Sequence, residues 1–198
     1  MKDLSAWVVV CLIVSAASAS ADETTGTLTL DWLSHISFEK RENLAINPGS
    51  TLRFHFGDPA ADGSIPFTLA PPDVSIDAIP APDGVGTIRY ALASVASGWI
   101  QPTASGHRME FSATVAVTLD GRGATGQTFT YSLPFTTESV SATSETGSVS
   151  RSGMRLVDGA WYVNLVAATV NKTNAYPEPG AAVYAVLSGQ FDQVPISE

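Results

Sequence analysis

The sequence has a single cysteine, Cys11, which lies in an apolar N-terminal stretch. We expect this stretch to be removed from the mature protein, as argued below, which would leave a chain without thiol or disulfide. Such a chain has no thiol nucleophile and no cysteine-based zinc site. It also has no blue-copper centre, because that centre requires a thiolate ligand. Its stability has to come from a hydrophobic core.

Catalytic signatures are also missing. The sequence contains no G-x-S-x-G elbow, no H-E-x-x-H motif and no glycine-rich phosphate-binding loop. His107 and Glu110 are three residues apart on a predicted strand, so they face opposite sides and do not form an acid–base pair. Glycosidases use two carboxyl groups ~5–10 Å apart, and nothing marks Glu110 and Glu138 as such a pair. A secreted hydrolase is therefore our third hypothesis, with no catalytic residue assigned and no enzymatic activity expected.

Positive charge is scarce. Ten Lys and Arg residues stand against 19 Asp and Glu residues, giving a net charge of −9. A negative field of this kind repels the phosphates of nucleic acids, so we expect no nucleic-acid partner. The acids are scattered along the chain, as is typical of a surface that keeps an exported protein soluble.

The N-terminus has the pattern of a secretory signal peptide. An apolar run over 6–14 is followed by small residues, and Ala19 and Ala21 form an A-x-A cleavage site before Asp22. The run is shorter than the ~20 residues that span a bilayer. A lipoprotein anchor on Cys11 is the alternative, but Val10 is not the small residue such processing prefers. We predict a signal peptide over 1–21 and export to the periplasm or the extracellular space.

Most of the remaining chain, 22–198, alternates between apolar and polar residues with a period of two. In 109–119 the odd positions are apolar and face one side. After a glycine-rich turn the pattern resumes over 127–135, which predicts a β-hairpin. Turns rich in Pro, Gly and Asp separate about nine or ten such segments. The sequence therefore predicts one all-β domain: an antiparallel β-sandwich of the immunoglobulin-like or jelly-roll type, with no membrane span.

The sequence makes a specific prediction for each of two other segments. The pattern over 27–38 predicts one long, half-buried strand in which Trp32 faces the core, interrupted only by Ser34. The segment 136–152 is rich in Ser and Thr and has few large apolar groups, so it predicts a loop or a weak edge strand.

The segments 160–170 and 182–191 are apolar on both faces. They are either central strands covered on both sides or strands whose second face contacts another molecule. Our first functional hypothesis uses the second interpretation. It describes an exported, non-enzymatic structural or binding module that assembles with itself or with an envelope partner. The residues of this assembly surface are Tyr162, Val166, Val170, Tyr184 and Val186.

The alternative hypothesis is a carbohydrate-binding module. Proteins bind sugars by stacking their C–H faces on exposed aromatic rings. Trp99 and Tyr176 lie in turn-like sequence contexts and are the two candidate rings.

The stretch HFGDPAADG, residues 55–63, contains the one candidate metal site. Asp58 and Asp62 offer carboxylates to a calcium ion, but Ca²⁺ takes ~6–8 oxygen ligands, and Arg53 lies on the same strand face as His55. Asp-Pro and Asp-Gly are also the residues that a tight turn requires. We expect the stretch to be a turn, with Ca²⁺ at Asp58 and Asp62 as the alternative and no other cofactor.

Overall fold

The structure is a computed structural model that describes residues 24–38, 43–80, 86–121, 126–138, 140–144, 147–151, 153–171 and 179–196. The signal peptide predicted over 1–21 lies outside these residues. The strands are β1 (Thr24–Leu30), β2 (His35–Phe38), β3 (Asn43–Ala45), β4 (Thr51–Phe56), β5 (Ile65–Leu69), β6 (Val74–Ser75), β7 (Ile79–Pro80), β8 (Gly86–Leu92), β9 (Ala96–Thr103), β10 (Gly106–Gly121), β11 (Gln127–Thr137), β12 (Val140–Ser144), β13 (Gly147–Arg151), β14 (Met154–Val157), β15 (Ala160–Val170) and β16 (Ala182–Phe191).

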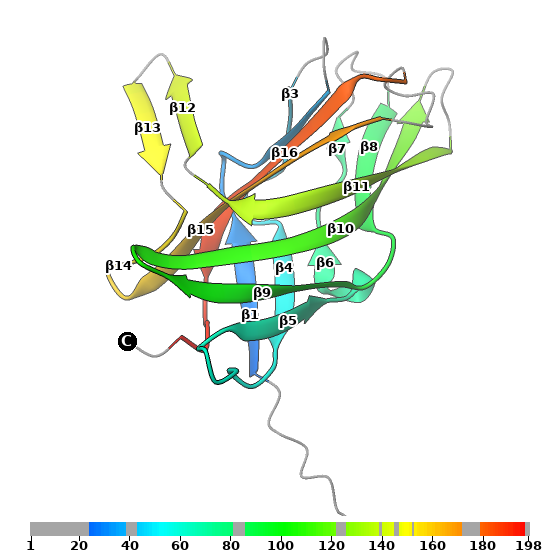
Figure 1. Cartoon of the computed structure of the whole chain (residues 1–198). Coiled ribbons are helices and arrows are strands. Elements are labelled where there is room, and N and C mark those ends of the chain that lie inside the picture. The colour runs from blue at the N-terminus through cyan, green and yellow to red at the C-terminus, as the bar shows by residue number, and fades with distance from the viewer. Residues whose placement is uncertain are drawn as a thin grey trace, which may run out of the picture.

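The main sheet closes on itself. Strands β1, β4, β5, β9, β10, β11, β15 and β16 pair in that order, each antiparallel to the next, and β16 pairs back to β1 (Figure 1). The prediction of an all-β, antiparallel protein is confirmed. The finer prediction of two stacked sheets is not what the structure shows, because these eight strands form one closed barrel with additional strands outside it. A period of two assigns faces to a strand but does not assign its neighbours.

The additional strands arise because the long strands change partners along their length. The first part of β10 pairs with β9 and its last part, 115–121, pairs with β8. In the same way β4 pairs with β5 at one end and with β6 at the other. Strand β16 adds β2, which in turn pairs with β3. The wall is therefore a continuous barrel at one end and is extended by short strands at the other.

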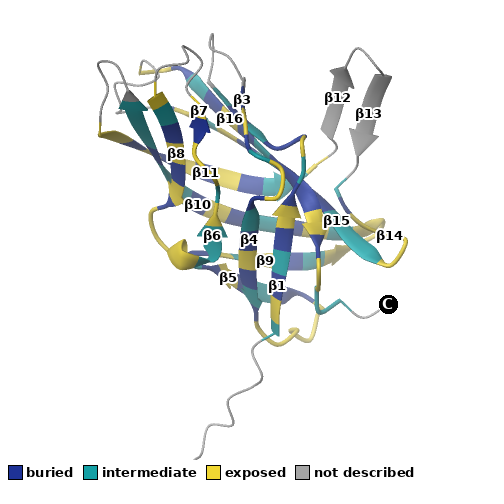
Figure 2. Cartoon of the chain, turned by 180° about the vertical axis from the view of Figure 1, so that it is seen from behind, coloured by how far each residue is buried: buried dark blue, intermediate teal, exposed yellow. Residues whose placement is uncertain are grey.

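The barrel interior is filled by apolar side chains that alternate along the strands, as the sequence predicts. Figure 2 shows the corresponding alternation of buried and more exposed positions along the strands. In β10, Met109, Phe111, Ala113 and Val117 are buried. A cluster of phenylalanines occupies the closed end, with ring centroids 5.3 Å apart for Phe54 and Phe67 and 5.0 Å apart for Phe111 and Phe135. Packed aromatic pairs of this kind contribute about 0.5–1.5 kcal/mol beyond their buried area. The other members of the cluster are Phe56 and Phe191.

The prediction of one long strand over 27–38 is wrong. Strand β1 ends at Leu30 and the chain turns at 31–34, where the Asp31 carboxylate accepts the Leu33 backbone N–H (2.9 Å). Trp32 lies in this turn and is 52% exposed, so it does not face the core. Ser34, the one polar residue in the apolar pattern, is fully buried because its side chain bonds to strand β16.

The segment 136–152, predicted to be a loop or a weak edge strand, contains strands. Strand β11 continues to Thr137, and β12 and β13 then pair with each other as a separate two-stranded hairpin that projects from the barrel (Figure 1). No helix within the described part of the chain is long and apolar enough to cross a membrane.

Candidate functional site

A groove of about 640 Å³ lies on the outer wall of the barrel, where β4, β5 and β9 run side by side. The register places outward-facing side chains in two rows across these strands. His55, Thr68 and Ser97 form the first row, and Pro66 and Trp99 form part of the second. The residues that line the groove include His55, Asp58, Pro66, Thr68, Ser97 and Trp99. His55 and Asp58 of the stretch 55–63 therefore line the same groove as Trp99, from which they are distant in the sequence.

Trp99 is the exposed aromatic side chain among the residues that line this groove, since Phe56 and Phe67 are buried. It lies within strand β9 rather than in a turn, and it is 47% exposed. Its neighbours Gly98 and Ile100 face the other way, and Ile100 is fully buried. Since strand alternation turns Trp99 outward, its exposure is a consequence of the register. The second candidate ring, Tyr176, lies outside the described residues.

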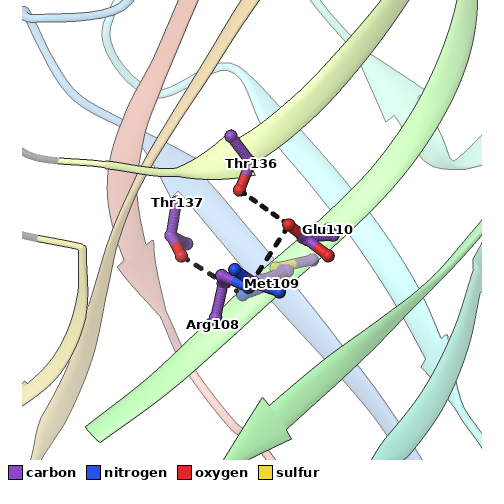
Figure 3. A network of polar contacts seen from close by, with 5 residues as sticks. All are labelled: Arg108, Met109, Glu110, Thr136 and Thr137. Carbon is purple, nitrogen blue, oxygen red and sulfur yellow. Dashed lines mark hydrogen bonds and ion pairs between the residues drawn. The ribbon is translucent and has the colours of Figure 1, made fainter. Parts of the chain in front are cut away.

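A small polar network adjoins Trp99 on the next strand. Glu110 of β10 is the register partner of Trp99. Its Oε1 lies 3.2 Å from Arg108 Nε and accepts a hydrogen bond from the Thr136 hydroxyl (3.2 Å) (Figure 3). The Met109 backbone N–H donates to Thr137 Oγ1 (3.3 Å), which ties β10 to β11. The side chains of Arg108 and Glu110 are about half exposed, so they present donors and acceptors beside the ring.

The imidazole of His55 is held by a carboxylate. Its Nε2 lies 3.1 Å from Asp73 Oδ2, where Asp73 ends the short 3₁₀ turn before β6. Sequence spacing did not reveal this pair, because Asp73 is 18 residues away and reaches His55 through the turn at 71–73. Both side chains are partly buried, and their contact holds the ring at the edge of the groove.

The two aspartates predicted to bind calcium have different surroundings. Asp58 lines the groove. Asp62 accepts hydrogen bonds from the hydroxyl (2.6 Å) and the backbone N–H (2.9 Å) of Ser64, and these bonds lower the pKa of its carboxyl. This is the geometry of an Asx turn. No group of three or more His, Cys, Asp or Glu side chains suited to a metal occurs among the described residues. Calcium binding here stays a prediction.

His107 does not belong to the groove. It is the second residue of β10 and lies on the face opposite Glu110, and its ring meets that of Trp161 edge-on with centroids 5.4 Å apart. Burial against this ring lowers the pKa of His107, which favours the neutral imidazole.

The predicted assembly surface lies on the outward face of β15 and β16. Val170 is 50% exposed and Tyr184 is 48% exposed, whereas Tyr162, Val166 and Val186 are half-buried. The register pairs Val166 with Val186 and sets Tyr184 opposite Ala168. Val166, Val170, Tyr184 and Val186 therefore form an apolar strip on the outside of the barrel, and the buried polar pair Asn164 and Ser188 separates this strip from Tyr162.

Three groove residues were not predicted from the sequence, namely Pro66, Thr68 and Ser97. No local signal identifies them, because each becomes part of the groove through the pairing of β5 with its neighbours. Asp73, which contacts His55 from the turn at 71–73, was not predicted either. Known proteins provide no guide either: no family model, no curated protein and no solved structure matches this chain.

Proposed function

We propose that this protein is an exported, non-enzymatic binding module that recognises glycans through the groove beside Trp99. The observation that carries the proposal is a half-exposed indole ring in the middle of a strand, on the wall of a groove of about 640 Å³. Ligand sites commonly have volumes of ~300–1,000 Å³ and combine an aromatic surface with a few polar groups.

The chemistry around the ring suits a sugar. An indole face packs against the C–H face of a pyranose, and hydroxyl groups need donors and acceptors at its rim. The groove offers the Thr68 and Ser97 hydroxyls and the Asp58 carboxylate. Arg108 and Glu110 adjoin the ring from β10. This set favours a neutral, hydroxyl-rich ligand over an anionic one, because the chain carries a net charge of −9.

Replacing Trp99 tests the proposal. We expect Trp99→Ala to weaken binding at least tenfold, since the loss of a central aromatic contact typically costs ~2 kcal/mol or more. The measurement is titration calorimetry with the tightest ligand found in a panel of gluco-, manno-, xylo- and chito-oligosaccharides. Trp32→Ala is the matched control, because Trp32 is 52% exposed and does not line the groove. Equal losses of affinity in the two variants, or no loss in either, would contradict binding through the groove.

A second candidate function is self-assembly through the apolar strip on β15 and β16. The observation that favours it is the exposure of Val170 and Tyr184 next to the half-buried Val166 and Val186. Apolar patches on the outside of a protein often mark contacts with other proteins.

Light scattering across a concentration series tests this second candidate. Assembly through the strip predicts a multimer in the unaltered protein that becomes a monomer in Tyr184→Lys. Thr128→Lys is the control, because Thr128 is exposed on β11, away from the strip. If the unaltered protein is a monomer at every concentration, the strip is not an assembly surface.

A further inference from the structure

A second hollow lies inside the barrel wall. It is a cavity of about 50 Å³ between the core residues of β4, β10, β11 and β16 on one side and the short strands β6 and β8 on the other. Its walls include Leu52, Ile76, Leu92, Val115, Leu133 and Ala185. It shares no lining residue with the groove beside Trp99.

The lining of this cavity is almost entirely hydrocarbon. Tyr90 is the one lining residue whose side chain carries a polar atom. A buried water needs roughly 10–15 Å³ and two to four polar partners. The cavity has room for a few waters but lacks the partners that would hold them, so an apolar occupant is favoured over water.

The wall is interrupted next to the cavity. At the closed end β5 pairs with β9 and joins β4 to β10. Further along, β6 extends β4 and β8 extends β10. Strand β7, which follows β6 after three residues, pairs with β8 at 87–88, and among the described pairings none links β6 to the rest of β8. Cavity-lining residues reach the surface at this seam, where Val74 and Ile76 are half-buried and Ala91 is exposed. Half-buried apolar side chains at this seam therefore lie between the cavity and the surface.

We propose that the cavity binds the end of an unbranched alkyl chain that enters between β6 and β8 and bears a neutral headgroup. The volume excludes an aromatic ring, because a cavity that accepts benzene offers about 150 Å³, roughly three times the 50 Å³ here. Asp77 is exposed directly after Ile76, so a negative charge at the mouth disfavours an anionic headgroup.

A series of 1-alkanols from butanol to decanol tests the proposal on the purified protein. The change in the methyl NMR signals gives the dissociation constant for each alcohol. Each methylene that enters the cavity should tighten binding by about fourfold, and the gain should stop once the cavity is full. Benzene should give no saturable binding. An affinity that does not depend on chain length, or saturable binding of benzene, would overturn the proposal.

A pair of matched substitutions locates the site. Ala185 is buried and lines the cavity, so Ala185→Leu should fill it and weaken binding of the best alkanol at least tenfold. Ala168→Leu makes the same change on the exposed face of β15 and should leave binding unchanged. If Ala185→Leu does not fold, Ala113→Val fills the same cavity with a smaller addition. Binding that survives in the folded filling variant would contradict the assignment.

Discussion

Gly98→Ala is expected to lower the free energy of unfolding by roughly 3 kcal/mol or more, the largest stability effect we predict for a single added methyl group. A Cβ at this position would overlap the carbonyl oxygen of Glu110. It would also lie 2.5 Å from Phe111 Cβ and 2.7 Å from Phe67 Cζ. The contacts with backbone and with buried rings leave no flexible side chain to move aside, so β9 would have to separate from β10.

Urea denaturation of Gly98→Ala and of the unaltered protein measures this effect. Ser97→Ala is the matched control, because Ser97 is exposed on the neighbouring position and should change stability by less than ~0.5 kcal/mol. A Gly98→Ala protein as stable as the control would mean that β9 and β10 are not as close as the register implies.

Asn164→Ala is expected to destabilise the protein by about 2–3 kcal/mol, because it leaves buried polar groups unsatisfied. Asn164, Ser188 and Ser34 are all fully buried on the outward side of the barrel. The Ser188 hydroxyl donates to Asn164 Oδ1 (2.8 Å), and Asn164 Nδ2 donates to the Gly153 carbonyl (3.4 Å). The network therefore fastens the turn at 31–34 and the start of β14 to the pair β15–β16.

Thermal and urea unfolding of Asn164→Ala should both show the loss. Gln190→Ala serves as the comparison, since Gln190 is an exposed polar residue on the same pair of strands. If the two variants unfold alike, the buried network contributes nothing beyond an ordinary surface amide.

The strands and their faces were largely predictable from the sequence, because alternation in β10 and β11 follows from burial of one face. The closure of the sheet into a barrel was not predictable. It depends on β16 pairing with both β1 and β15, and strand neighbours leave no signal in a single sequence. The turn at 31–34 was missed because Trp32 continues the apolar alternation of β1, although it lies in the turn and is exposed.

The candidate site was predictable only in its parts. The sequence alone predicts Trp99 as a candidate aromatic binding residue and Asp58 as an acidic turn residue, but it does not place the two together. The connection comes from β5, which pairs with β4 on one side and with β9 on the other and so carries Thr68 and Pro66 into the groove. The partner of His55 was hidden for the same reason, since Asp73 reaches it from beyond β5.

The central claim is that the groove beside Trp99 binds glycans. The most direct measurement is a glycan-array screen of the purified protein and its Trp99→Ala variant, side by side. Our account predicts that the unaltered protein binds a chemically related set of neutral glycans and that Trp99→Ala loses the whole set. Binding of no glycan, or the same set bound by the variant, would contradict it.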